Sequence, residues 1–273
     1  MIGGGTMGAG IASALARAGI RTELIEVSEE LAQAGLARAR EMIEDGVARN
    51  RITPSDGEVA KRLLVPCPDV AQASPRPRLV IEAVPERVDL KHAVLASAEA
   101  LEPQMLATNT SGISIDELAE GVSDPSRFIG LHFFNPVPAI ALVEVVLGSA
   151  TSEQTRRAAI ELVAEIGKEA IVVADSPGFA TSRLGVALGL EAIRMVEEGV
   201  AEPEDIDRAM VLGYRYPVGP LRLGDIVGLD IRLDIARNLS AVFGERFAPP
   251  PLLERMVSEG RLGKKSGRGF YDW

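Results

Sequence analysis

Short apolar runs recur through the first two thirds of the chain, and each has the length of a β-strand. They read RTELIE, LVIEAV, MLATNT, FIGLHFF, LVEVV and AIVVA. Helical patterns separate them, the clearest over residues 6–18, which are mostly small, and residues 28–49. Strands that alternate with helices are typical of a mostly parallel sheet covered on both faces. The fold class predicted for this part is therefore α/β.

The pattern changes near Asp175. Beyond it no convincing strand pattern occurs, and apolar residues at helical spacing predict helices over residues 179–198, 203–212, 225–243 and 251–259. We therefore expect two domains, an α/β domain over residues 1–175 and an all-α domain over residues 176–273.

Three local features in the first part have structural explanations. Ser114-x-x-Glu117 and Thr151-x-x-Gln154 each fit a capping box, in which two side chains satisfy backbone N–H groups at a helix start. Cys67, in LLVPCPDV, fits a small residue packed at the end of a strand. None of these residues needs a catalytic or binding role.

Composition narrows the classes of function. A net charge of −10 disfavours nucleic acid as a partner, because binding to phosphates depends on clustered Lys and Arg. No apolar run has the length of about 18 residues that a membrane span needs. The single cysteine excludes an internal disulfide and favours a reducing, cytoplasmic location. We expect no metal site.

A glycine pattern lies almost at the start of the chain, as Gly3-x-Gly5-Thr6-Met7-Gly8. It enters a helix of small residues, and the next strand ends in an acid, Glu26. In dinucleotide-binding proteins such a loop lets the pyrophosphate approach the helix N-terminus, and the acid binds the adenosine ribose. A carboxylate there repels a 2′-phosphate, so NAD is favoured over NADP. The alternative is a glycine-rich start followed by an ordinary surface glutamate.

The stretch GLHFFNPVPAIALVEVV holds one of only two histidines. His132 closes an apolar strand next to Asn135, and Glu144 lies on the following strand. A histidine with a carboxylate behind it is a general base, because the carboxylate orients the ring and stabilises its positive charge. Alone, His132 would more often be a satisfied core histidine. The other histidine, His92, lies on a predicted helix without an evident partner and is interpreted as structural.

Motifs spread over the whole chain carry a family resemblance. They are GGGTMGAGIA, NTS, GLHFFNPVP, LVEVV, DSPGF, LRLGDIVGLD and the closing GKKSGRGFYDW. In order and spacing the chain, from Gly3 to Trp273, resembles the L-3-hydroxyacyl-CoA dehydrogenases, which include the bacterial 3-hydroxybutyryl-CoA dehydrogenases. The resemblance implies a Rossmann-type NAD-binding domain and an all-helical second domain through which the chain forms a homodimer. It also implies NAD-linked oxidation of a 3-hydroxyacyl-CoA to the 3-ketoacyl-CoA.

The resemblance also assigns roles to single residues. His132 corresponds to the general base and Glu144 to its partner. Ser111 and Asn135 match polar groups near the nicotinamide and the substrate oxygen. The implied cofactor contacts, besides the glycine loop and Glu26, are Glu86, Lys91 and Lys265. Two alternatives stay open, a helix-face pair for Glu86 and Lys91 and a solvated charge run for Lys264 and Lys265.

The chain departs from the family pattern at two places. Ser182, implied to contact substrate, stands where the family has asparagine, and a serine hydroxyl has a shorter reach. The family also carries an apolar first strand at the centre of the sheet, whereas only Met1 and Ile2 precede the glycines here. We expect this strand to be largely missing, through a misassigned start codon or a truncation, in an otherwise unchanged fold.

Two other functions remain open. One is a dehydrogenase of the same fold that acts on a hydroxy acid without CoA, and the other is a non-catalytic NAD-binding protein. The pair His132 and Glu144 argues against the second.

Overall fold

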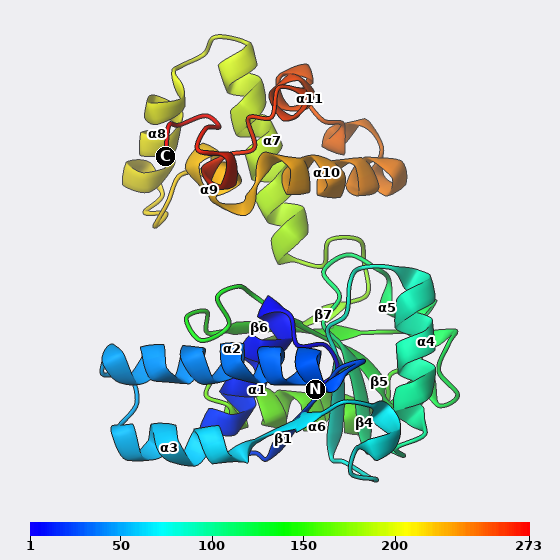
Figure 1. Ribbon diagram of the computed structural model, residues 1–273. Helices are drawn as coiled ribbons and strands as arrows, with labels where there is room; N and C mark the ends of the chain where they lie inside the picture. Colours follow the sequence, from blue (N-terminus) through cyan, green and yellow to red (C-terminus); the bar gives the residue numbers. More distant parts are fainter. The chain divides into compact units, whose positions relative to one another are not determined.

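A computed structural model describes residues 1–273 as two compact units, Met1–Ser176 and Pro177–Trp273 (Figure 1). The first is an α/β unit and the second is helical, which confirms the predicted fold class. Each unit is described separately below.

The first unit is built on a mostly parallel sheet. Its strands are β1 (Thr22–Ile25), β2 (Leu64–Cys67), β3 (Leu79–Glu82), β4 (Met105–Thr108), β5 (Phe128–Phe133), β6 (Leu142–Leu147) and β7 (Glu169–Ala174). Strands β1 and β2 form one pair, and β3 to β7 lie side by side in chain order. Strands β5 and β6 pair antiparallel and all other neighbours pair parallel. This confirms the mostly parallel sheet that the apolar runs predicted. Cys67 ends β2 and is buried, as expected.

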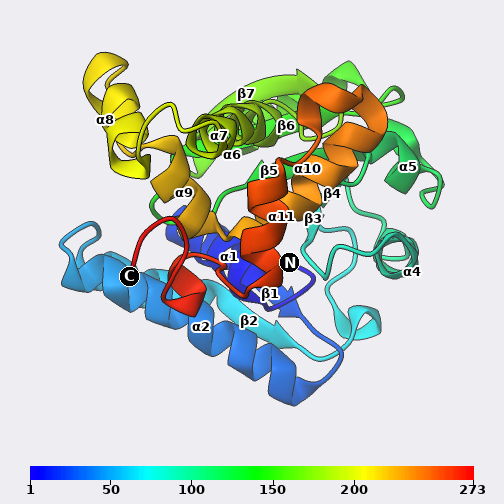
Figure 2. The same cartoon turned by 90° about the horizontal axis from the view of Figure 1, so that it is seen from above.

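Helices cover this sheet. They are α1 (Thr6–Arg17), α2 (Glu29–Ala48), α3 (Pro54–Leu63), α4 (Val88–Glu99), α5 (Ile115–Ala119) and α6 (Glu153–Glu165), with 3-10 turns at Val70–Gln72 and Pro125–Arg127. Figures 1 and 2 show α1 and α2 side by side. The small residues of α1 also let the loop after β5 approach closely, because a Cβ at Gly10 would lie 2.9 Å from the Val137 side chain, and it would lie 3.7 Å from Met42 on α2.

The two predicted capping boxes have different outcomes. The Ser114 side chain accepts a hydrogen bond from the Glu117 N–H and caps α5. At α6 the expected cap was wrong by one residue, because Ser152 accepts the N–H of Thr155. Thr151 instead accepts the Gly148 N–H and donates to the Phe128 carbonyl, so it ties the loop to β5.

Met1 and Ile2 lie between β1 and β3. Ile2 forms parallel bridges to both Ile25 and Glu82, so a short segment joins the two parts of the sheet at its centre. Next to it a groove of about 230 Å³ is lined mainly by apolar residues of β1, β3 and the surrounding helices. The amine of Met1 is buried here and donates to the Glu23 carbonyl at 2.8 Å.

The second unit consists of five helices and a C-terminal tail. The helices are α7 (Thr181–Glu197), α8 (Pro203–Gly213), α9 (Pro220–Val227), α10 (Leu229–Phe243) and α11 (Pro251–Ser258), with 3-10 turns at Glu245–Phe247 and Lys264–Ser266. The single helix predicted over residues 225–243 is wrong, because Gly228, with φ 110°, separates α9 from α10. Asp225 is fully buried and accepts the backbone N–H groups of Phe270 and Tyr271, which fixes the tail to α9.

None of the helices combines the length and apolar composition that a membrane-spanning helix needs.

Candidate active site

The glycine loop joins the central Ile2 to α1. Gly3 has φ 94°, a conformation that side chains rarely adopt, and a Cβ there would approach the Ala83 carbonyl oxygen to 2.8 Å. A Cβ at Gly8 would collide with the Gly3 carbonyl, so this glycine allows the first turn of the helix to pack on the loop. At Gly5 a Cβ would meet no protein atom. That open position is where the second glycine of the motif admits a pyrophosphate.

The N-terminus of α1 fits an anionic ligand. Its N-cap residue, Gly5, provides no capping side chain, and the first turn, which begins with Thr6 and Met7, contains no acid. The first N–H groups of a helix lack intrahelical partners and carry partial positive charge. This end of α1 can therefore hold a dinucleotide phosphate.

Glu26 follows β1 and lies against the glycine loop. Its Oε1 atom accepts the Gly4 N–H at 2.6 Å, so the carboxylate is held beside the loop. Arg38, on α2, donates to the Gly4 carbonyl at 2.8 Å from the other side. Sequence patterns did not single out Arg38, because a lone arginine on an exposed helix face carries no signal.

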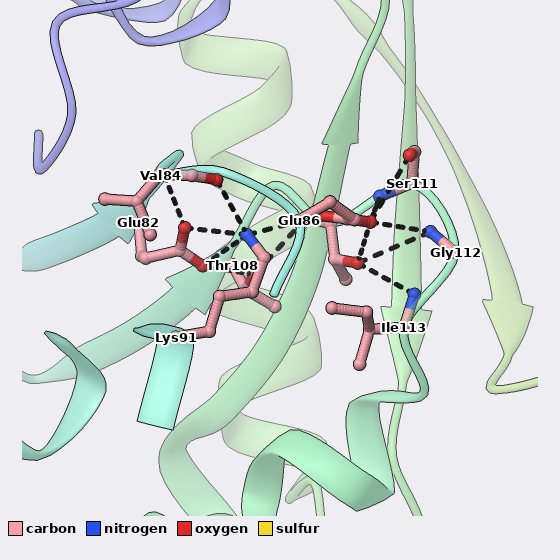
Figure 3. Close-up of polar contacts among 9 residues, drawn as sticks. Glu82, Val84, Glu86, Lys91, Thr108, Ser111, Gly112 and Ile113 are labelled. Carbon is pink, nitrogen blue, oxygen red and sulfur yellow. Dashed lines mark hydrogen bonds and ion pairs between the residues drawn. The ribbon is translucent and has the colours of Figure 1, made fainter. Parts of the chain in front are cut away.

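Glu86 and Ser111 come together after β3 and β4 (Figure 3). The Oε1 atom of Glu86 accepts the Ser111 N–H at 2.8 Å and the Thr110 hydroxyl at 2.6 Å. Burial acts to raise the pKa of the Glu86 carboxyl, but the Thr110 hydroxyl, the charge of Lys91 and the backbone N–H groups outweigh it and leave the pKa lowered. Glu86 thus stays ionised and fixes the loop that carries Ser111.

Lys91 lies beneath this loop, with only 1% of its surface exposed. Its Nζ donates to Glu82 at 2.7 and 3.0 Å, to the Val84 carbonyl at 3.2 Å, and forms an ion pair with Glu86 at 3.3 Å (Figure 3). The Thr108 hydroxyl donates to the Oε2 atom of Glu82 at 2.7 Å. The alternative of a helix-face pair is wrong, because Glu86 precedes α4 and Lys91 is buried in a network centred on Glu82, an acid that no sequence pattern selected.

His132 and Glu144 are direct partners across the antiparallel pair β5 and β6. The Nδ1 atom of His132 lies 2.7 Å from the Glu144 Oε2 atom, and both residues are buried. The ring also lies 4.4 Å, centroid to centroid, from that of Phe134. Buried polar pairs are stable only when they are hydrogen-bonded, and this contact fixes the tilt of the imidazole.

Asn135 and Ser111 are exposed at the ends of the neighbouring parallel strands β5 and β4. The Oδ1 atom of Asn109 accepts the Phe133 N–H at 2.9 Å and so connects the two strand ends. The carboxyl ends of adjacent parallel strands meet at one edge of a sheet, where ligands of α/β proteins bind. His132, Asn135 and Ser111 therefore belong to one edge of the first unit.

The two remaining predicted residues belong to the second unit. Ser182 lies in the first turn of α7 and is half-buried. The Nζ atom of Lys265 donates to the Asp230 carboxylate at 2.6 Å, so this lysine is a member of an ion pair.

Both units match one enzyme family. Residues 1–176 match the NAD binding domain of 3-hydroxyacyl-CoA dehydrogenase, and residues 178–273 match its C-terminal domain. The chain belongs to the 3-hydroxyacyl-CoA dehydrogenase family, and it is an enzyme that uses NAD.

Three relatives are similar to this chain over nearly its whole length. A 3-hydroxybutyryl-CoA dehydrogenase of Mycobacterium tuberculosis is 42% identical, over 100% of this chain and 97% of the relative. A probable 3-hydroxybutyryl-CoA dehydrogenase of Bacillus subtilis is 40% identical, over 99% of this chain and 95% of the relative. The crystal structure of the (S)-3-hydroxybutyryl-CoA dehydrogenase PaaH1 from Ralstonia eutropha is 37% identical, covers 100% of this chain and 97% of its own, and superimposes with a TM-score of 0.93.

Proposed function

We propose that the protein interconverts L-3-hydroxyacyl-CoA and 3-ketoacyl-CoA, with His132 and Glu144 as its acid-base pair. The observation that carries this proposal is the 2.7 Å contact between His132 Nδ1 and the buried Glu144 carboxylate. The relatives named above support a CoA thioester as the substrate, with 3-hydroxybutyryl-CoA as the first to test.

The chemistry follows from this pair. Because Nδ1 is bound to Glu144, Nε2 is the atom that takes the proton of the substrate hydroxyl during oxidation. Bound NAD would supply the acceptor for the hydride that leaves C3, and His132 would take the proton that the hydroxyl loses. The adjacent carboxylate stabilises the imidazolium that results, and in the reverse direction this ring returns the proton to the carbonyl oxygen.

Ser111 and Asn135 have positioning roles in this proposal. Both are polar and exposed at the sheet edge that carries His132. Ser111 is held in place by Glu86, whose carboxylate accepts its N–H and, at 3.3 Å, its hydroxyl. A hydrogen bond from either side chain to the substrate oxygen would fix that oxygen before the proton moves, which is how orientation accelerates such a step.

The decisive assay follows the oxidation of NADH with acetoacetyl-CoA and, in parallel, with a panel of free 3-keto acids. We expect turnover confined to CoA esters, together with little activity when NADPH replaces NADH. Turnover of the free acids alone would favour the dehydrogenase of non-CoA hydroxy acids. NADH binding without turnover of any substrate would favour a non-catalytic NAD-binding protein.

We also propose that the protein is a homodimer formed through the second unit. That unit exposes several large apolar side chains, including Leu212 near the end of α8, Tyr214 just after it and Ile226 on α9, with 71%, 73% and 48% of their surfaces accessible. Clusters of exposed apolar residues often mark protein interfaces. Light scattering coupled to gel filtration should give the mass of two chains, and Leu212→Glu should shift it toward one.

A further inference from the structure

A buried acid lies at the carboxyl end of β3, in the network drawn in Figure 3. Glu82 is fully buried, and its carboxylate accepts the Val84 N–H at 2.6 Å and the Thr108 hydroxyl at 2.7 Å. The ammonium of Lys91 donates to both carboxylate oxygens, at 2.7 and 3.0 Å. Every partner is a donor, which is the pattern of an ionised carboxylate, because a protonated one would place its O–H against one of these donors.

The network contains more negative than positive charge. Lys91 is its cation and forms ion pairs with Glu82 at 2.7 Å and with Glu86 at 3.3 Å, and no other cation pairs with either acid. Burial acts to raise the pKa of the Glu86 carboxyl, but the Thr110 hydroxyl, the charge of Lys91 and two backbone N–H groups leave the pKa lowered. We call Glu82, Lys91 and Glu86 the acidic triad. Two carboxylates and one ammonium give it a net charge of −1.

The acidic triad lies beside the glycine loop. Ala83, the residue after β3, donates its N–H to the Ile2 carbonyl at 2.8 Å, and its carbonyl oxygen would lie 2.8 Å from a Cβ at Gly3. Glu26 follows β1 on one side of Ile2, whereas the triad follows β3 on the other side. A dinucleotide with its adenosine ribose at Glu26 and its pyrophosphate at the glycine loop therefore extends its nicotinamide half across the ends of β3 and β4.

The two forms of the cofactor differ in charge only at the nicotinamide ring. The ring is a cation in NAD⁺ and is neutral in NADH, whereas the phosphates have the same charge in both. A fixed negative charge near the ring therefore favours the oxidised form, and a buried charge is screened less than an exposed one.

We propose that the net negative charge of the acidic triad, supplied by the buried Glu82, sets the relative affinity of the protein for NAD⁺ and NADH. Without Glu82 the remaining ion pair of Lys91 and Glu86 is neutral. The inference goes beyond the proposed function, because it concerns the bound cofactor and holds for any substrate.

Two variants change the charge of the acidic triad and then restore it. Glu82→Gln makes the triad neutral with little change in shape, because the amide oxygen can accept the Lys91 ammonium and the Val84 N–H. The amide NH2 can donate to the Thr108 hydroxyl. The double variant Glu82→Gln, Lys91→Met removes both buried charges and leaves Glu86, so the net charge is again −1.

Two further variants serve as a second test and as a control. Glu86→Gln also makes the acidic triad neutral, but it does so at a side chain that is 41% exposed and not in the protein interior. Glu153→Gln is the control, because it removes one negative charge from an exposed site at the start of α6, where Glu153 pairs only with Arg156.

The measurement is the ratio of the Kd for NAD⁺ to the Kd for NADH. The fluorescence of NADH gives one constant and calorimetric titration with NAD⁺ gives the other, and neither requires turnover. Glu82→Gln should raise this ratio about threefold to tenfold, the size expected for one unit charge acting through a partly hydrated site. Glu86→Gln should raise the ratio as well. The double variant should return it toward the value of the unchanged protein, and Glu153→Gln should leave it unaltered.

Equal weakening of both affinities by Glu82→Gln would overturn the proposal, because it would indicate a purely structural role for the buried acid. A double variant whose ratio stays at that of Glu82→Gln would overturn it too, since restored charge would then have no effect. If Glu82→Gln does not fold, Glu86→Gln decides, and an unchanged ratio in that variant contradicts the proposal. These affinities do not depend on the substrate, so a failure of the proposed reaction is distinguishable from a failure of this inference.

Discussion

The buried amine of Met1 should make the free energy of unfolding depend on pH. Burial lowers its pKa from 8.0 to about 6, although the neighbouring Glu23 acts in the opposite direction. The folded chain therefore holds this amine uncharged between these two values, whereas the unfolded chain holds it protonated. Because the unfolded state binds more protons in this range, stability should rise with pH from about 6 to 8.

The size of this effect follows from the shift. One pKa unit corresponds to about 1.36 kcal/mol, so a decrease from 8.0 to about 6 represents roughly 3 kcal/mol. This destabilisation is fully present below the folded pKa and disappears above the unfolded one. The free energy of unfolding of a whole protein is typically about 5–15 kcal/mol, so a change of this size would be readily measurable.

The perturbation is an extension of about five apolar residues in front of Met1, roughly the length of a typical strand. It converts the amine into an amide and provides side chains for the 230 Å³ groove between β1 and β3. Its backbone N–H and C=O groups can also pair with the facing edges of β1 and β3, which are now bridged by Ile2. The extended chain should melt at a higher temperature and bind NAD more tightly, because the central segment leads directly into the glycine loop.

Urea denaturation of both chains at several values between about pH 5.5 and 8.5 tests this reasoning. Every other titratable group is common to both chains, so its contribution cancels in the difference. The advantage of the extended chain should be largest at the acidic end and should decrease by roughly 3 kcal/mol toward the alkaline end. A difference that does not vary with pH would refute the argument that the amine is buried uncharged. An equal melting temperature at every pH would also refute the benefit of filling the groove.

Three further predictions concern the cofactor and the substrate. His132→Gln should reduce the rate of oxidation at least about a hundredfold in steady-state assays, with the affinity for NAD intact. Glu144→Gln should also lose most activity. Near-full rates in these variants would contradict the mechanism. Glu26→Gln keeps an acceptor for the Gly4 N–H but loses the charge, so the ratio of kcat/KM for NAD over NADP should fall; an unchanged ratio would show that charge does not select the cofactor. Ser182→Ala should cost ~0.5–1.5 kcal/mol in turnover, the contribution of one hydrogen bond. Ser182→Asn should leave the acyl-chain preference unchanged, and a shift toward shorter acyl-CoAs in a substrate panel would argue that this residue shapes the pocket.

Periodicity predicted the regular parts of the fold because it reports burial on the face of a strand or helix. The apolar runs coincide with β1 and β3 to β7, and all of these strands except the largely exposed β7 are mostly buried. Two predictions failed where a local conformation decided the outcome. Gly228 interrupts the pattern of residues 225–243 by adopting φ 110°, and Ser152 instead of Thr151 caps α6 because Thr151 bonds to the Gly148 and Phe128 backbone. Hydrophobic periodicity reports neither the positive φ of Gly228 nor the bond from Thr151 to the distant Phe128 carbonyl.

The candidate site was predictable to the extent that its residues lie on regular strands. His132 and Glu144 could be paired in advance because a histidine backed by a carboxylate is a general base and the family resemblance implies both roles, and the observed register places them opposite each other. Arg38 and Asn109 could not be selected. Each acts on a backbone group, the Gly4 carbonyl and the Phe133 N–H, and such contacts leave no pattern in composition or spacing.

Lys91 shows why a match to a motif does not by itself define a contact. A lysine so close to Glu86 in sequence suggests a surface pair or a cofactor ligand, yet the fully buried Glu82 holds its ammonium at 2.7 Å. A buried carboxylate without a cation would be strongly destabilising, so Lys91 is required wherever Glu82 is ionised. The same ammonium lies 3.3 Å from Glu86, whose carboxylate binds the Ser111 N–H at 2.8 Å. The charge of Glu82 therefore acts through Lys91 and Glu86 on the position of Ser111, and a change at this buried acid should alter the loop at the sheet edge without touching any ligand.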